Sequence, residues 1–158
     1  MLIKKWKVIR EFNFIDTLAL LKFMDKNNYY YSPWIRNIVN KYNYNFKSYF
    51  KPIELYRISL NDLEFKRPTV LKDVYSKSID HGFKLINPEL ALLTRLFYNE
   101  QPQGEWLRFA TPFNPMIDED GIPHLPKIGK ALNSFFIETY WAYENAIFHP
   151  HNEFVFLK

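Results

Sequence analysis

Residues 101–123, QPQGEWLRFATPFNPMIDEDGIP, constrain the fold more than any other part of the sequence. They predict a strand over residues 104–113, a tight acidic turn at residues 118–121 and then a second extended segment. Gly121 can take the positive φ that hairpin turns require, and the Asp side chains before it favour a turn. Because side chains alternate along a strand, we expect Glu105, Leu107, Phe109 and Thr111 on one face and Trp106, Arg108 and Ala110 on the other. Trp106 is the largest apolar group of this strand, so we expect it in the core beneath the sheet.

The hundred residues before this stretch carry helix signals. Ser32-Pro33 and Asn87-Pro88 each place a cap residue before a proline at the first helical position. Asp16 is a predicted N-cap, and Leu18, Leu21 and Met24 are expected on the buried face of the helix that follows. The expected helices cover residues 16–28, 33–42, 69–82 with Gly82 at the end, and 88–98, the last of them largely buried.

Strand signals lie mainly later in the chain. Residues 3–14 predict an edge strand or an ordered arm, and residues 53–60 predict a strand that follows a surface loop at residues 43–50. Residues 131–141 can be helical or extended, and their aromatic and β-branched residues favour a strand. Residues 152–157 predict a closing strand.

The order of these elements predicts the fold class. Helices dominate residues 1–100 and strands dominate residues 101–158, which indicates an α+β protein with N-terminal helices packed against a C-terminal, mostly antiparallel sheet. A chain of 158 residues is long enough for one domain with a real core and too short for two, so we expect a single domain over residues 1–158. Its 15 Phe, 11 Tyr and 4 Trp residues bury much area per residue and stabilise such a domain.

Composition also excludes several classes of protein. The chain has no Cys, which excludes disulfides and thiolate metal sites. Asp16 interrupts the first apolar run, so the N-terminus does not read as a signal peptide, and no window approaches the roughly 18 apolar residues of a membrane span. We therefore expect a soluble, intracellular protein of the cytoplasm.

The second half of the chain resembles a family of short bacterial proteins without an assigned activity. The resemblance rests on Gln101-Pro102 with Gly104-Glu105-Trp106-Leu107, on Asp120-Gly121-x-Pro123, and on Pro150-x-Asn152-x-Phe154-Val155-Phe156. It covers roughly residues 69–158 and implies a helix of the 69–82 kind, a second short helix and the strand hairpin. The second helix departs from the family pattern, which has a Cys and a basic residue at its start where this chain has Asn87-Pro88-Glu89.

No motif predicts catalysis, a cofactor or a metal. His149-Pro150-His151 places two imidazoles two residues apart, but a structural metal site needs more ligands than this pair. The acidic turn lacks the carboxylate that a calcium loop beginning at Asp118 needs at its twelfth position, which is Gly129. The serines lack the glycines of a nucleophile elbow, and four scattered glycines form no phosphate loop. We expect a protein that is not an enzyme, although a constellation assembled only in space stays open.

Charge is unevenly distributed between the two halves of the chain. Residues 1–84 carry 16 Lys and Arg against 8 Asp and Glu, a net charge of +8, and residues 85–158 carry 5 against 9, a net charge of −4. Lys4, Lys5, Trp6, Lys7 and Arg10 interleave cations with an aromatic ring, a combination that single-strand nucleic-acid binding uses. The alternative, which we expect, is a solvated surface whose cations scatter or pair with nearby carboxylates such as Glu11, Asp25, Glu54 and Glu64. Sequence-specific DNA reading is not expected, because the apolar helix 88–98 is built for a core.

The leading functional hypothesis is a protein partner. Tyr and Trp are enriched in interface hot spots, and we expect an aromatic-rich binding surface that includes Tyr29, Tyr30, Tyr31, Trp141 and Tyr143. The alternative is that these rings close the core of the domain. The sequence thus predicts a non-enzymatic binding protein that acts on another protein, and the second hypothesis is a nucleic-acid-binding accessory protein that uses the basic N-terminal half. Pathway and oligomeric state are left open.

Overall fold

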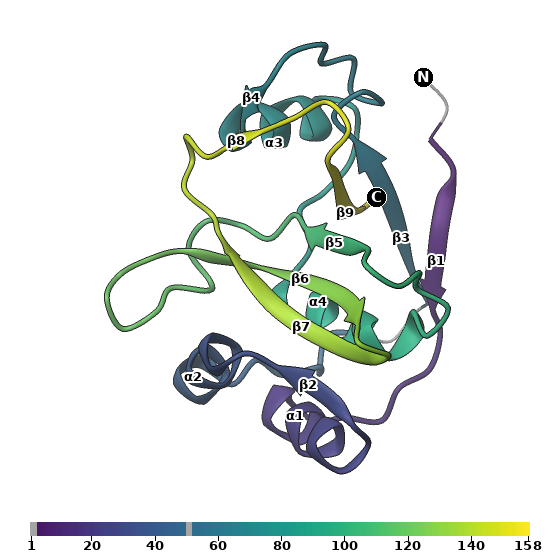
Figure 1. Ribbon diagram of the computed structural model, residues 1–158, viewed down its shortest axis with the longest axis vertical. Helices are drawn as coiled ribbons and strands as arrows, with labels where there is room; N and C mark the ends of the chain where they lie inside the picture. Colours follow the sequence, from purple (N-terminus) through teal and green to yellow (C-terminus); the bar gives the residue numbers. More distant parts are fainter. Residues whose placement is uncertain (1–2, 50–51) are drawn as a thin grey trace.

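A computed structural model describes residues 3–49 and 52–158, and its centre is a seven-stranded sheet (Figure 1). The strands follow the order β1-β3-β9-β5-β6-β7-β2 across the sheet. Their bounds are β1 Lys5–Ile9, β2 Tyr29–Tyr31, β3 Ile53–Ser59, β5 Trp106–Phe109, β6 His124–Ala131, β7 Ser134–Trp141 and β9 Glu153–Leu157. The helices are α1 Thr17–Lys26, α2 Pro33–Tyr42, α3 Leu71–Asp80 and α4 Pro88–Thr94, the last continued by the 3-10 turn η1 Arg95–Phe97. A separate two-stranded sheet joins β4 (Thr69–Val70) to β8 (Ile147–Phe148).

The pairing of the strands confirms the predicted α+β class. Neighbours in the large sheet are antiparallel except for β2 beside β7 and β5 beside β9, which are parallel. Strand β1 lies at one edge, as predicted. The strand predicted at the end of the chain is confirmed as β9, which lies between β3 and β5. Strands β1, β2 and β3 also show that the first sixty residues contribute to the sheet as well as the helices.

The predicted N-termini of α1 and α2 are confirmed, whereas α3 begins only at Leu71, because Thr69 and Val70 form β4, and α4 ends at Thr94 and continues as a 3-10 turn. Asp16 Oδ1 accepts a hydrogen bond from the Ala19 amide at 2.9 Å, and Ser32 Oγ accepts one from the Ile35 amide at 3.4 Å. Gly82 follows α3 with a φ of +87°, the left-handed conformation that ends helices. The predicted face of α1 is wrong at Leu18, which is 40% exposed, because the helix buries Leu20 beside Leu21 and Met24 instead.

Two apolar cores lie on opposite faces of the sheet. Helices α1, α2 and α4 cover the first face, onto which β5, β6 and β7 project Leu107, Phe109, Ile128 and Ile137. On the second face, α3 and the β4–β8 pair cover β3 and β9, where they bury a smaller cluster that includes Phe154. Figure 1 shows β6 and β7 towards the viewer with no helix in front of them. We call this half of the second face, which no helix covers, the open half, although Leu125 of β6 is buried there in the second cluster.

The strand expected over residues 104–113 is shorter in the structure. Strand β5 ends at Phe109, and the chain runs through a loop to β6 at His124. Pro112 explains part of the difference, since a proline cannot donate to a sheet ladder. The acidic turn is confirmed: Asp118 Oδ1 accepts hydrogen bonds from the amides of Asp120 and Ile122 at 2.9 and 3.0 Å, and Gly121 has a φ of +79°.

The expectation that Trp106 lies in the core is wrong. The alternation along the strand is as predicted, but Leu107 and Phe109 occupy the helix-covered face and are buried. Trp106 projects onto the open half of the second face and is only partly buried. Size alone therefore does not decide which side chain is buried, because burial depends on which face the helices cover.

The loop predicted at residues 43–50 is described up to residue 49, and residue 50 lies outside the described residues. Residues 43–49 contain no helix, but Phe46 is only 5% exposed and packs into the first core, so the segment is not purely a surface loop. Within the described ranges, no helix combines the length and the apolar character needed to cross a membrane.

Candidate nucleic-acid interface

Aromatic side chains form a row across the open half of the sheet. Strand register places Tyr30 beside Phe136, Phe136 beside Gly129, and Gly129 beside Trp106, so these four positions share one face. Ring centroids are 5.5 Å apart between Tyr30 and Phe136 and 6.5 Å apart between Phe136 and Trp106. We call Tyr30, Phe136 and Trp106 the aromatic row.

Gly129 creates the space in which the Trp106 ring lies. A Cβ added at Gly129 would stand 2.5 Å from Cδ2 and Cζ3 of Trp106, far inside an ordinary van der Waals contact. The indole therefore covers the glycine directly and packs flat against β6. A broad aromatic surface parallel to the sheet is the kind of platform on which a nucleic-acid base stacks.

Two cations lie next to this row on the same face, each two residues along its strand: Arg108 follows Trp106 on β5, and Lys127 precedes Gly129 on β6. Arg108 pairs in register with Lys127, and Lys127 pairs with Glu138 on β7. Lys127 Nζ lies 5.1 Å from the Trp106 ring centroid, and Arg108 Cζ lies 5.1 Å from that of Tyr140. Among the described residues, neither cation forms an ion pair, and Arg108 Nε is buried without a hydrogen-bond partner. We call Arg108 and Lys127 the cation pair.

The electrostatics of the cation pair are unfavourable without a ligand. Burial lowers the pKa of Arg108 below its ordinary value, and Tyr140 opposes this only in part. Burial is also the main cause that lowers the pKa of Lys127, and the positive charge of Arg108 adds to it while Glu138 opposes it. Two partly desolvated positive charges side by side would be stabilised by an anion placed between them.

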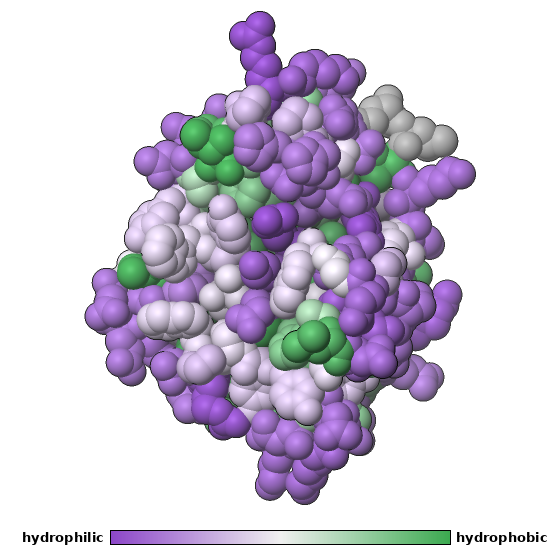
Figure 2. Space-filling model, viewed as in Figure 1, coloured by the Kyte–Doolittle hydropathy of each residue, from purple (hydrophilic) through white to green (hydrophobic). Residues whose placement is uncertain are grey.

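Figure 2 shows this face of the molecule. Pale and green residues, of intermediate and high hydropathy, gather in the centre of the view, and purple hydrophilic residues lie among and around them. The aromatic row, the cation pair and Tyr140 are all on β2, β5, β6 and β7, the strands that no helix covers on this side. The open half is therefore a mixed aromatic and cationic surface.

Two of the four basic residues near the N-terminus, Lys5 and Lys7, are paired within the protein. Lys5 Nζ lies 2.7 Å from Glu54 Oε1, and Lys7 forms an ion pair with Glu100 while its ammonium lies 4.9 Å from the Tyr98 ring. Trp6 packs edge-on against Tyr98 and is partly buried, whereas Lys4 and Arg10 are exposed. Arg36 with Asp25 and Lys77 with Glu64 form further pairs. The predicted pairing with Glu54, Asp25 and Glu64 is confirmed for Lys5, Arg36 and Lys77.

The ion pairs of Arg57 adjoin this N-terminal strand. Arg57 lies between Glu105 and Glu153, with nitrogen to oxygen distances of 3.0 and 2.8 Å, and Glu105 also accepts from the Tyr98 hydroxyl at 2.8 Å. Burial alone would lower the pKa of Arg57, but Glu153 and Glu105 outweigh burial and raise it. Every charge here has a partner, so the cluster stabilises the fold and offers no free charge to a ligand.

The five aromatic residues predicted as a partner-binding surface are split by the fold. Tyr29 and Tyr31 turn to the helix side, where their hydroxyls donate to Asn99 at 3.0 Å and Asp25 at 2.6 Å. Tyr30 alternates to the open face and is 49% exposed. Trp141 and Tyr143, which are 60% and 43% exposed, lie at the end of β7 and in the loop beyond it. The five therefore do not form one patch.

The histidines lie in three separate places. His149 and His151 are exposed with ring centroids 5.9 Å apart, and His81 is exposed at the end of α3. His124 is buried, with Nε2 2.7 Å from Asp118 Oδ2 and Nδ1 3.1 Å from Thr139 Oγ1. Burial would raise the pKa of Asp118, but hydrogen bonds from His124 and two backbone amides outweigh it and lower the pKa. The described residues contain no group of three or more His, Asp or Glu placed to hold a metal ion.

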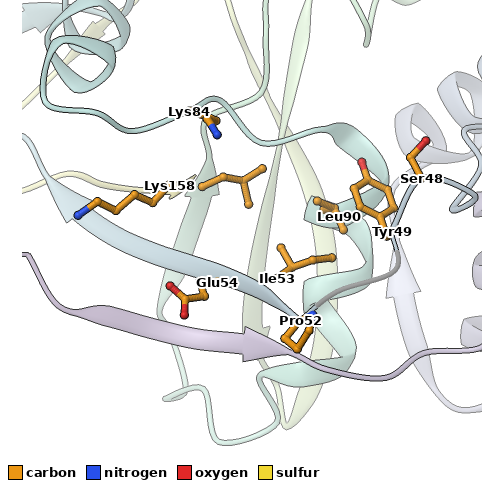
Figure 3. Close-up of a pocket in the computed structure, with 9 residues that line it drawn as sticks. Ser48, Tyr49, Pro52, Ile53, Glu54, Lys84, Leu90 and Lys158 are labelled. Atoms are coloured by element: carbon orange, nitrogen blue, oxygen red, sulfur yellow. The ribbon is translucent and has the colours of Figure 1, made fainter.

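A cavity of about 520 Å³ opens beside β3 and β9 (Figure 3). Glu54 and Lys158 lie towards one end of it, and Ser48 and Tyr49 towards the other. Glu54 already pairs with Lys5, and the Tyr49 hydroxyl donates to Glu89 at 2.6 Å and accepts from Asn87 at 2.7 Å. The polar atoms of Glu54 and Tyr49 are therefore already engaged within the protein and are not free to act on a ligand in the cavity.

No protein-family model, curated protein or solved structure matches this chain. The resemblance of residues 69–158 to a family of short bacterial proteins therefore stays a prediction.

Alternation along one strand predicts that Arg108 and Trp106 share a face, but it does not predict that Lys127, Phe136 and Tyr140 lie beside them. These three belong to strands β6 and β7, and alternation within each strand indicates which residues share a side. It does not indicate which residue of one strand lies beside which residue of the next. The site becomes visible only when the register of β5, β6 and β7 is known.

Proposed function

We propose that this protein is a non-enzymatic binding protein that binds single-stranded nucleic acid on the open half of its sheet. The observation that carries the proposal is the cation pair, in which Arg108 and Lys127 lie side by side without an ion pair among the described residues. A phosphate group would supply the missing negative charge. The aromatic row beside the pair would supply stacking for the attached bases.

The spacing of the face suits a nucleotide chain. Residues paired across neighbouring strands lie roughly 5 Å apart, and residues two apart along a strand lie roughly 6.6 Å apart on the same face. The aromatic row and the cation pair are separated by one such step, since Trp106 and Arg108 are two residues apart. A base stacked on the row therefore holds its phosphate within reach of the cations.

The same geometry favours a single strand over a duplex. A base stacks on an aromatic side chain only when it is unpaired and free to turn its face to the protein. The row offers ring faces and few groups that could read the edge of a base, so binding should tolerate many sequences. A cytoplasmic location, where RNA is abundant, is part of this proposal.

The test is a salt titration with a fluorescently labelled oligouridine of about ten nucleotides. Each phosphate neutralised on a single strand contributes about −0.7 to the slope of log affinity against log salt concentration. Replacing both Arg108 and Lys127 by Gln should weaken binding and bring the slope closer to zero by about 0.7–1.4. The matched control replaces Lys4 and Lys5 by Gln, removes the same charge from the N-terminal strand, and should leave the slope almost unchanged.

A second variant separates stacking from charge. Phe136→Ala should weaken binding by about 1–3 kcal/mol, the usual cost of losing one stacked base, with the salt slope retained. The proposal is wrong if the oligouridine shows no saturable binding at low salt. It is also wrong if the Lys4 and Lys5 control loses as much affinity as the variant of the cation pair.

A further inference from the structure

The outer edge of β7 is open over its last residues. Strand β2 pairs with β7 only from Phe135 to Ile137, and the chain then turns into α2 at Pro33. On that side of β7, the residues that the structure describes place no strand beside Glu138–Trp141. The opposite side of the same residues is paired with β6.

Hydrogen bonds at both ends of this segment determine the direction of its backbone groups. The Ser32 amide donates to the Ile137 carbonyl at 3.0 Å, so the backbone of Ile137 faces β2. The Ala142 amide donates to the Pro123 carbonyl at 2.9 Å, so the backbone of Ala142 faces β6. Because successive residues of a strand direct their backbone groups to opposite sides, the amides and carbonyls of Thr139 and Trp141 point away from β6, on the same side as those of Ile137. Pro126, opposite Thr139, agrees with this assignment because it has no amide to donate.

An apolar hollow adjoins the open edge. Its volume is about 370 Å³, and it is lined by Thr139, Tyr140, Trp141, Tyr143, Ala146 and Ile147. Trp141 is 60% exposed, Ile147 is 59% exposed and Tyr143 is 43% exposed. Three large apolar or aromatic side chains thus stand in solvent beside unpaired backbone donors and acceptors.

Acidic and basic residues both lie near this edge. Glu138 and Glu144 are the only charged residues in the sequence from Ser134 to Phe148. Glu138, however, lies opposite Lys127 in the register of β6 and β7, and both Arg108 and Lys127 lie close to the Tyr140 ring. Glu144 is exposed in the loop that forms one wall of the hollow. A ligand that pairs with this edge would therefore gain from basic residues of its own.

We infer that the β7 edge binds an extended peptide as an added strand, with a large apolar side chain in the hollow and Lys or Arg residues beside it. The unpaired backbone groups of Thr139 and Trp141 supply the main-chain hydrogen bonds, which is how strand addition gains affinity. The hollow supplies selectivity for one side chain, and the exposed Glu144 selects a basic flank. This site adjoins the proposed nucleic-acid surface and shares Tyr140 with it, but it binds through the backbone of the β7 edge and not through the open face.

The probe is an amidated pentapeptide with a central leucine, a valine on each side and a lysine at each end. Fluorescence titration or isothermal calorimetry should show saturable binding. A set of copies, each with an N-methyl group on one backbone amide, should alternate in affinity along the peptide. Affinity should fall at least tenfold where the methylated amide faces β7 and change little where the amide faces away. The proposal fails if the peptide shows no saturable binding, or if every N-methylated copy binds as the parent does.

Two matched variants of the protein test the same edge by changing the protein instead of the peptide. Thr139→Pro removes the outward amide of Thr139 at a position where an edge strand tolerates proline, and it should weaken binding at least tenfold. Thr139→Val also loses the hydroxyl that contacts His124 but keeps the amide, and it should bind within about twofold of the parent protein. Equal binding by these two variants would contradict strand addition. The N-methylated peptides keep the test valid if Thr139→Pro does not fold.

Charge reversal tests the basic flanks. Glu144→Lys should weaken binding of the lysine-flanked peptide and strengthen binding of a copy flanked by glutamate. Sedimentation of the protein alone provides the remaining test, because a second copy of the chain is the competing occupant of the edge. A dimer that Thr139→Pro dissociates would overturn the peptide assignment.

Discussion

Gly129→Ala should destabilise the protein only when Trp106 is present. The added methyl group would lie 2.5 Å from Cδ2 and Cζ3 of the indole, whereas ordinary contacts lie at 3.4–4 Å. The ring must therefore retreat by about 1 Å and lose part of its packing against β6. Overpacking of this kind costs about 1–3 kcal/mol.

The backbone effect of the same substitution has the opposite sign. Gly129 does not have a positive φ, so alanine fits its conformation and restricts the unfolded chain, a gain of about 0.4–1 kcal/mol. The free energy of unfolding should fall by about 1–2 kcal/mol in the parent protein. In a Trp106→Ala background the clash is absent, and Gly129→Ala should raise the free energy of unfolding by about 0.4–1 kcal/mol.

Urea denaturation of the parent, the two single variants and the double variant measures this cycle, with circular dichroism as the signal. The expected coupling between positions 106 and 129 is about 1–3 kcal/mol. A Gly129→Ala substitution that stabilises or destabilises both backgrounds equally would refute the contact between the indole and β6. Leu132→Ala provides a control, because Leu132 is 89% exposed and should not couple to Trp106.

Three other predictions concern stability. Phe109→Ala, at a fully buried position, should cost about 3–5 kcal/mol, whereas Trp106→Ala should cost only about 1–2 kcal/mol, as urea melts can show. Arg57→Met leaves Glu105 and Glu153 without their cation. Because these groups are only partly buried, the free energy of unfolding in the same assay should fall by about 2–3 kcal/mol, less than for a fully buried pair. Asp118→Asn should lower the free energy of unfolding at neutral pH. Folding lowers the pKa of Asp118, so its contribution is present above the ordinary value of 3.8 and is lost as the pH falls through the folded pKa. Melts of both proteins across this pH range should therefore converge at low pH.

Local features of this fold could be predicted from the sequence. Asp16 and Ser32 cap helices because their side chains reach amides three residues ahead, and that distance is fixed by local geometry. Gly121 and Gly82 take positive φ for a similarly local reason. Alternation along β5 was also predictable, since it depends on one strand only.

Features that depend on distant segments could not be predicted. Trp106 is on the open face because the helices cover the other face. The residues that determine which face the helices cover lie outside the strand that contains Trp106. The three residues of β2 are too few for an alternation signal, yet their parallel pairing with β7 places Tyr30 beside Phe136. Lys127 joins Arg108 only through the register of β5 with β6. The candidate site depends on the pairings of β2 with β7, β5 with β6 and β6 with β7, so no motif within one segment predicts it.

The central position of β9 has a consequence for how the chain folds during synthesis. Strands β1 and β3 form one part of the sheet and β5, β6, β7 and β2 form the other, and β9 alone joins the two parts. Strand β3 ends at Ser59, but its partner ends at Leu157, about a hundred residues later. At roughly 5–20 residues per second, the ribosome needs about 5–20 s to make the intervening chain. During that time the β3 edge is unpaired and its apolar side chains are uncovered, so the nascent chain should depend on chaperones more than its modest length suggests.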